Sequence, residues 1–213
     1  MDALAHFDTW QLVALAATLG VASGLRLYAV LFIVGAAGYL GWVDLPSGLV
    51  TLQHPLVLAA SGFMCFVEFF ADKVPGVDSL WDVVHTLIRI PAGAALAGAV
   101  FGDSSSAMML AAAILGGTLA AGSHFTKASS RAVINTSPEP FSNWAASFAE
   151  DVAVGGLVWL GIAHPLAAAV VVLAMIGLMI WLLPTAWRAA RRIADRITGW
   201  RGRDPSRFGG TGR

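Results

Sequence analysis

Long apolar stretches alternate with short polar ones along the whole chain. A helix needs about 20 mostly apolar residues to cross a bilayer, with a usual range of about 17–25. The pattern therefore predicts an all-α, polytopic membrane helix bundle with six or seven hydrophobic segments. These lie at about 10–24, 26–42, 55–72, 80–102, 107–127, 144–163 and 165–184. The first is short: it could cross the bilayer, form a re-entrant half-helix, or begin one long bent helix.

The composition supports a membrane environment. Hydrophobic residues make up 57% of the chain and charged residues only 12%, whereas soluble domains carry about 25% charged residues. So little polar surface cannot cover so large an apolar core in water. The single cysteine excludes an internal disulfide and a cysteine-based metal cluster.

Lys and Arg are distributed unevenly, and this predicts an orientation. Eight of the thirteen follow Leu183, and basic residues favour the cytoplasmic side of a bacterial inner membrane. The C-terminus is thus expected in the cytoplasm, together with Lys73 and a loop at 128–143 flanked by Lys127 and containing Arg131. The opposite turns, 43–54, 103–106 and 163–165, contain no Lys or Arg.

Three regions are expected along the chain. Residues 1–184 form the transmembrane helical domain. Residues 185–200 read as a cytoplasmic, basic amphipathic helix that lies on anionic lipid, because Ile193 and Ile197 share one face and arginines cover the other. Residues 201–213, rich in Gly and Arg, are expected to be a disordered tail.

Polar residues follow helical spacing within three of the apolar segments. Residues three and four apart lie on one face of a helix, and the spacing yields one stripe for each segment. The stripes are Ser61, Cys65, Glu68 and Asp72; Asp78, Asp82, His85 and Arg89; and Asn143, Ser147 and Glu150, with Asp151 beside them. A charge at mid-bilayer costs about 2.5–3.5 kcal/mol, so it needs a partner or a wet cavity. Arg89 is the deepest base of these stripes, and we expect Glu68, Glu150 or Asp151 to be its partner.

These stripes define a candidate site for a substrate or an ion. Its members are Glu68, Asp72, Asp82, His85, Arg89, Ser147, Glu150 and Asp151, with Arg26, Asp78 and His124 as additional candidates. They would line either a polar vestibule open to the cytoplasm or a buried ion-pair network that fixes helix packing. No standard spacing indicates a metal, no cofactor is predicted, and none of the common enzyme motifs is present.

Two parts of the chain share a weak pattern that suggests an internal hairpin repeat. Residues 58–102 and 112–161 each place a Trp twelve residues before a Gly, and Glu68-Phe69 aligns with His124-Phe125. Transporters often contain such repeats, with the substrate site at their interface.

Three blocks together carry a resemblance to a known family. They are GLRLYAVLFIVGAAGYLGW, EFFADKVPGVDSLWD, and the pattern K-x3-R followed by SN-W-x2-S-x2-ED. Over residues 10–190 the chain resembles the domain of unknown function 4126 family of small bacterial integral membrane proteins. That resemblance implies no activity. Its charged motifs fall on Glu68, Asp72, Lys73, Asp78, Asp82, Glu150 and Asp151.

The sequence thus predicts a small transporter or channel-like protein for a cation or a proton-coupled solute. The alternative is a non-transporting membrane scaffold or lipid-binding accessory protein, and an enzyme acting on lipid is the least favoured class. Membrane lipids are the expected partners, with anionic lipid at the C-terminal helix. Glycine-rich faces would allow homo-oligomers, and nothing indicates nucleic-acid binding.

Overall fold

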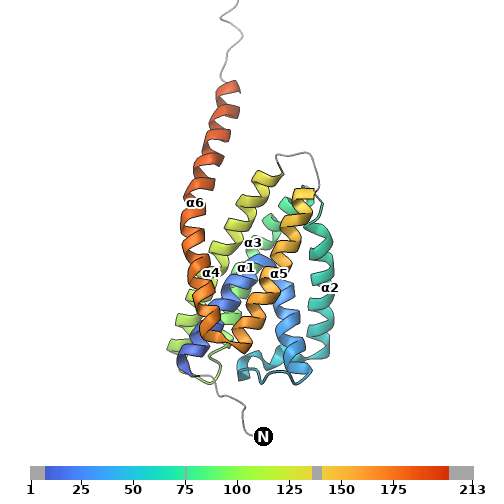
Figure 1. Ribbon diagram of the computed structural model, residues 1–213, viewed down its shortest axis with the longest axis vertical. Coiled ribbons are helices and arrows are strands. Elements are labelled where there is room, and N and C mark those ends of the chain that lie inside the picture. Colours follow the sequence, from blue (N-terminus) through green and yellow to red (C-terminus); the bar gives the residue numbers. More distant parts are fainter. Residues whose placement is uncertain (1–7, 75, 136–140, 202–213) are drawn as a thin grey trace, which may run out of the picture.

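The computed structural model describes residues 8–74, 76–135 and 141–201, without the side chains of 185–187 and 189–201. The described residues form six α-helices and one short 3-10 helix, with no strand (Figure 1). In chain order they are α1 (Thr9–Tyr39), η1 (Ser47–Gln53), α2 (Pro55–Ala71), α3 (Val77–Ala99), α4 (Ser106–Ile134), α5 (Phe141–Ala163) and α6 (Pro165–Arg201). The predicted all-α fold is confirmed.

Four of the described helices are long and apolar enough to cross a membrane: α1, α4, α5 and the Pro165–Pro184 part of α6. A fifth span is reached if η1 and α2, which meet at a bend of 72°, count as one. Helix α3 is not among them, because its polar stripe makes it too polar along its length. A membrane-type helical bundle is therefore shown, while the count of six or seven segments and the internal repeat stay predictions.

Helix α1 is the central element, and it is broken at Arg26, whose backbone angles (φ −147°, ψ 85°) are not helical. The half before Arg26 rises from the end of the bundle near the N-terminus, and the half after it returns to the same end (Figure 1). Packing agrees with this path. Val13 lines a small hollow with Met108 at the start of α4, and Gly38 packs against Gln53. The predicted segments 10–24 and 26–42 are thus the two halves of one bent helix.

Each half of α1 is shorter than a membrane is thick. At 1.5 Å per residue the halves are about 25 Å and about 20 Å long, against a hydrocarbon core of about 30 Å. Neither half is therefore long enough to cross the bilayer, and the break lies inside the bundle, short of the end opposite the N-terminus. Carbonyls near it would lack partners, but Lys127 Nζ donates to the Leu25 carbonyl at 3.2 Å and Ser123 Oγ to the Val21 carbonyl at 2.8 Å. Side chains of α4 thus replace bonds that the helix loses.

Glycines allow α1, α3 and α4 to pack closely around this break. A Cβ on Gly20 would lie 2.8 Å from the Gly116 Cα, and a Cβ on Gly93 would lie 2.6 Å from the Ser23 Oγ. Neither distance fits a side-chain atom at that position, so both helix crossings require glycine. The close approach brings the polar stripes of α3 and α4 against the break in α1.

Helix α3 has its polarity reversed relative to a helix of a soluble protein. Its buried face holds Asp78, Asp82, His85 and Arg89. Its opposite face exposes large apolar side chains, among them Leu80, Val83 and Leu87. Lipid is the solvent that accepts such a surface, because the exposed face matches hydrocarbon while the charges find partners inside.

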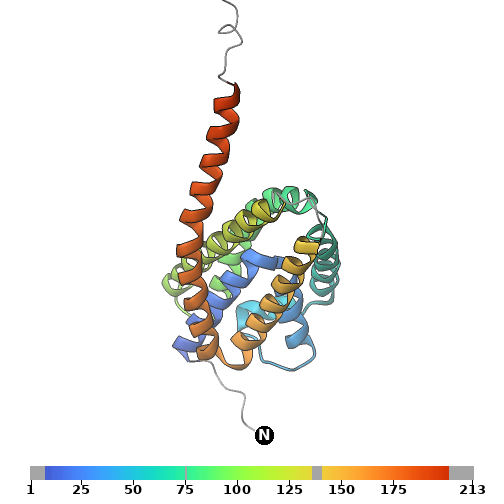
Figure 2. The ribbon, with the colours of Figure 1, turned by 45° about the horizontal axis from the view of Figure 1, so that its top comes forward.

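Helix α6 continues without interruption through Pro184 to Arg201. Its last turns extend beyond the other helices (Figure 2). No helix end separates the predicted membrane segment 165–184 from the predicted amphipathic helix 185–200. The amphipathic assignment rests on side chains that fall outside the described residues, as does the predicted tail from residue 202 onward.

Candidate functional site

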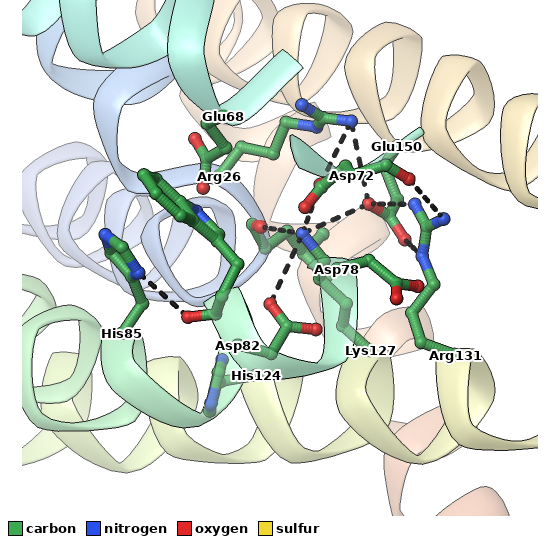
Figure 3. A network of polar contacts seen from close by, with 12 residues as sticks. Arg26, Glu68, Asp72, Asp78, Asp82, His85, His124, Lys127, Arg131 and Glu150 are labelled. Atoms are coloured by element: carbon green, nitrogen blue, oxygen red, sulfur yellow. Dashed lines mark hydrogen bonds and ion pairs between the residues drawn. The ribbon is translucent and has the colours of Figure 1, made fainter. Parts of the chain in front are cut away.

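Charged side chains from α1, α2, α3, α4 and α5 meet beside the break in α1, and Figure 3 shows many of them. We call this set the charged core, and it consists of Arg26, Glu68, Asp72, Asp82, Arg89, Lys127, Arg131, Glu150 and Asp151. Most of its members are sealed from solvent: Arg26, Glu68, Asp72, Arg89 and Arg131 are each at most 1% exposed. Glu150 and Asp151 are the most accessible, at 17% and 29% of their side chains.

One part of the charged core is built around Arg89 of α3. Its guanidinium donates to Glu68 Oε1 of α2 at 2.5 Å and to Asp82 Oδ1 at 2.7 Å. The expected pairing of Arg89 with Glu68 is therefore present, and Asp82 is a second partner. Glu150 and Asp151, the other predicted partners, instead bind bases on other helices. A single guanidinium thus holds two fully buried carboxylates.

His124 of α4 completes this part of the charged core. Its Nδ1 lies 3.2 Å from Arg89 Nη1 and its Nε2 lies 2.7 Å from Thr86 Oγ1. An arginine can only donate, so His124 Nδ1 accepts. The Thr86 hydroxyl donates to the Asp82 carbonyl at 2.9 Å, which leaves its lone pairs for the His124 Nε2–H. The contacts therefore require a neutral His124.

A second part of the charged core is built around Arg26, at the break of α1. Its guanidinium donates to Ser147 Oγ at 2.7 Å, and it pairs with Asp151 Oδ1 at 3.0 Å and Asp72 Oδ2 at 3.3 Å. Arg26 thereby ties the central helix to α5 and to the end of α2. This brings together the predicted candidates Asp72, Ser147 and Asp151 with the additional candidate Arg26.

Arg131 of α4 and Glu150 of α5 form a two-bond pair, with Nε to Oε1 at 3.2 Å and Nη2 to Oε2 at 3.0 Å. Arg131 Nη1 also donates to the Asp72 carbonyl and to the Asn143 side-chain oxygen, each at 3.1 Å. Such a planar, two-bond arrangement fixes direction as well as charge. Arg131 therefore orients the Glu150 carboxylate and also bonds the Asp72 carbonyl at the end of α2.

Lys127 of α4 joins the two parts. Its ammonium lies 2.6 Å from Asp72 Oδ2, 3.4 Å from Glu150 Oε2 and 3.7 Å from Asp82 Oδ1. Burial by itself raises the pKa of Asp72, which follows the last residue of α2. The nearby Lys127 and Arg26 outweigh burial and hold that pKa below its usual range. Asp72 is thus negatively charged at neutral pH.

Two predicted candidates lie beside the charged core and have structural partners of their own. His85 stacks on Trp81 with ring centroids 4.1 Å apart, and its Nε2 contacts the Tyr28 hydroxyl at 3.1 Å. Asp78 Oδ1 accepts from the backbone amides of Gly76 at 2.9 Å and Ser79 at 2.6 Å. Asp78 lies in the first turn of α3, whose N-cap is Gly76, and its two oxygens also accept from Asn135 Nδ2 at 2.9 and 3.0 Å. Asp78 thus joins the start of α3 to the end of α4.

The sequence analysis placed Lys127 and Arg131 at the edge of a cytoplasmic loop, and this was wrong. Helix α4 extends to Ile134, so both residues lie on it and are buried. The spacing of His124, Lys127 and Arg131, three and four residues apart, places them on one helical face. That spacing was the available signal, but the positive-inside pattern gave both residues another explanation.

Among the described residues, no group of three or more His, Cys, Asp or Glu side chains is placed to hold a metal ion. Each carboxylate of the charged core is instead held by Arg or Lys. Four buried carboxylate oxygens of the charged core still lack a hydrogen-bond partner: Glu68 Oε2, Asp72 Oδ1, Asp82 Oδ2 and Asp151 Oδ2. The charged core is thus paired but retains free acceptor capacity.

Apolar spanning helices around a buried set of charges define a polytopic helical membrane protein with a polar centre. A comparison with known families then places the chain more closely. Residues 13–185 match the family described as a domain of unknown function (DUF4126), and the chain belongs to that family. No curated protein and no solved structure matches the chain.

Proposed function

We propose that this protein is a small membrane transporter for a cation or a proton-coupled solute, with the charged core as its substrate site. The observation that carries the proposal is the break of α1 at Arg26, directly beside charges from α2, α3, α4 and α5. A helix broken inside a membrane bundle is a common way to build a transport site. The ends of two half-helices present opposite dipole ends to an ion, and at this break the Leu25 carbonyl is bonded by the Lys127 side chain rather than by the helix.

The shape of the bundle supports this proposal. The two halves of α1 return to one end, and η1 with α2 makes a second bent element at that end. Broken elements can rearrange without unfolding a complete spanning helix. Lys73, Lys127, Arg131 and the end of α6 all lie toward the opposite end, which is the proposed cytoplasmic side of an inner membrane. Six or seven segments, with α1 counted as two, fit this topology.

A second candidate function is a non-transporting scaffold, and the pairing of the charged core favours it. Arg89, Lys127 and Arg131 each have carboxylate partners and are buried, as expected of a network that only fixes helix packing. The free oxygens of Glu68, Asp72 and Asp82 count against a purely structural role. A structural network gains most when every buried acceptor is bonded.

The two candidates are separated by the Glu68→Gln variant, which keeps the shape of the side chain and removes its charge. Purified wild type and variant are placed in lipid vesicles, and the movement of protons, Na⁺ and K⁺ is followed with fluorescent indicators. A transporter predicts flux for wild type and at least a tenfold loss for a folded Glu68→Gln protein. The scaffold predicts no flux for either protein and a lower unfolding temperature for the variant.

Arg188→Met is the matched control for these vesicles. Arg188 is exposed on α6, and its Nε donates to the Pro184 carbonyl at 3.0 Å, away from the charged core. This variant removes one charge without touching the proposed site. Its flux should equal that of wild type, and equal losses in Arg188→Met and Glu68→Gln would contradict a role of the charged core in transport.

A further inference from the structure

Asp151 of α5 is the least stabilised carboxylate of the charged core. Its Oδ1 lies 3.0 Å from Arg26 Nε, but this contact is an ion pair and not a hydrogen bond, because the buried Arg26 Nε has no hydrogen-bond partner. Asp151 Oδ2 is also buried without a partner. The other acids of the charged core each accept a hydrogen bond from an arginine or a lysine; they are Glu68, Asp72, Asp82 and Glu150.

The charges of the core do not balance. Its five acids face four bases. Lys73, a further base near Asp151, is held by other groups. Its ammonium donates to the Phe69 carbonyl at 3.1 Å and to Ser147 Oγ at 3.2 Å, and it lies 3.0 Å from the centre of the Phe69 ring. An uncompensated charge in a buried network is strongly unfavourable. One bound proton would remove the excess acid charge.

Asp151 is also the acid of the charged core that a proton reaches most directly. Its side chain is 29% exposed, against 17% for Glu150 and at most 2% for the other three acids. A carboxylate needs water, hydrogen bonds or opposite charge to remain ionised. The titratable groups that act on Asp151 include two bases and two acids, which offset each other; the set is Arg26, Cys65, Asp72, Lys73 and Glu150.

We propose that Asp151 is the proton-binding residue of the charged core, and that the coupling ion of this transporter is therefore the proton. The proton binds at Asp151 Oδ2, where it forms an O–H bond and breaks no covalent bond of the protein. The bases and the remaining acids of the core are then equal in number. The inference rests on the proposed transport function and deepens it, since it names the coupling ion and the carboxylate that carries it.

Arg26 connects this proton to the break in α1. It is the residue of α1 with non-helical backbone angles, and neutral Asp151 no longer attracts its guanidinium. Arg26 keeps its contacts with Asp72 Oδ2 at 3.3 Å and Glu150 Oε2 at 3.8 Å, which Figure 3 shows as dashed lines. Binding and release of the proton therefore change the forces on the side chain at which the two halves of α1 meet.

The test is the infrared difference spectrum of the protein in lipid vesicles between about pH 5 and about pH 8, where an aspartate in water is ionised. A protonated carboxyl group has a carbonyl stretching band separate from the bands of a carboxylate. Wild type should show this band at the lower pH and lose it as the pH rises. Asp151→Asn should lack the band. Asp103→Asn, which removes an exposed acid from the turn between α3 and α4, should keep it.

Thermal unfolding in detergent is the second measurement, because Asn resembles the neutral form of Asp151. A proton bound by the folded protein stabilises it at low pH, and this stability is lost as the pH rises. The Tm of wild type relative to that of Asp151→Asn should thus fall by about 3–5 °C for each pH unit once the proton leaves.

Each outcome decides the inference. No protonated carboxyl band in wild type, a band that persists in Asp151→Asn, or one that Asp103→Asn also loses would overturn it. So would the same dependence of Tm on pH in wild type and Asp151→Asn, or an Asp151→Asn protein that cannot be recovered folded. These readouts do not depend on flux. Flux by wild type without the Asp151 band refutes this inference alone, whereas the band without flux refutes the transport proposal.

Discussion

Replacing Arg89 by Met should be the most destabilising single substitution in the charged core. The guanidinium is fully buried and holds Glu68 Oε1 at 2.5 Å and Asp82 Oδ1 at 2.7 Å. Met fills much of the same space but leaves Glu68 without its cation and Asp82 with only the more distant Lys127, at 3.7 Å. Breaking a buried ion pair by removing one partner costs about 3–5 kcal/mol. For a chain of this size that corresponds to a fall in Tm of about 6–20 °C.

The assay is thermal unfolding of purified protein in detergent, and size-exclusion chromatography then checks that the protein is not aggregated. Arg188→Met is the control, because it removes an exposed arginine outside the charged core. A triple variant tests the reason for the lower Tm. Arg89→Met combined with Glu68→Gln and Asp82→Asn removes the unpaired carboxylate charges as well. This triple variant should recover much of the lost Tm. An Arg89→Met protein within about 3 °C of wild type would refute the claim that Arg89 holds two buried charges, since that shift is about 1 kcal/mol.

The remaining predictions concern packing, hydrogen bonding and orientation. Gly20→Ala should lower stability by about 1–3 kcal/mol through overpacking, because the new Cβ would lie 2.8 Å from the Gly116 Cα. A Cβ at Gly156 meets nothing within 4 Å, so Gly156→Ala should be neutral or stabilising in the same unfolding assay. Asp78→Ala should cost about 1–3 kcal/mol, because it leaves the Gly76 and Ser79 amides and Asn135 Nδ2 without their acceptor. Asp78→Asn keeps an acceptor oxygen and should cost less; equal losses in both variants would contradict the role of these hydrogen bonds. A cysteine at Arg188 in a Cys65→Ala background should react with a membrane-impermeant thiol reagent only in opened cells, and labelling of intact cells would contradict the proposed cytoplasmic C-terminus.

The sequence predicted the membrane class and much of the candidate site, because both follow from local patterns. Apolar length identified the helices, and helical spacing put Asp78, Asp82, His85 and Arg89 on one face, which is the buried face of α3. The need of Arg89 for a buried carboxylate predicted Glu68, Glu150 or Asp151 as its partner, and Glu68 is the one that binds it. These inferences require only the geometry of one helix and the cost of a charge in lipid.

Pairings between distant helices could not be predicted in the same way. Arg26 binds Ser147 across 121 positions of the chain, and Lys127 binds Asp72 across 55. Which base meets which acid depends on how helices pack, and that is decided by close approaches such as Gly20 to Gly116. Lys127 and Arg131 were assigned to a loop edge, because a base near a helix end has two explanations and the sequence does not separate them.

The sequence did not determine whether the first segment spans, re-enters or bends, for a related reason. The stretch around Ser23 and Gly24 is compatible with a spanning, re-entrant or bent segment when it is considered alone. The break at Arg26 becomes favourable only because α2, α4 and α5 supply partners to its side chain and to the carbonyl before it. Tertiary contacts, rather than local propensity, thus determine the bend.

The most direct test of transport through the charged core is cation flux into vesicles that contain either wild type or Asp72→Asn protein. Asp72 is fully buried and bound by both Arg26 and Lys127, and Asn preserves its shape without its charge. Wild type should accumulate an alkali ion or exchange it for protons, while Asp72→Asn should be folded and at least tenfold slower. No flux by folded wild-type protein, or equal flux by both proteins, would contradict the proposed role of the charged core.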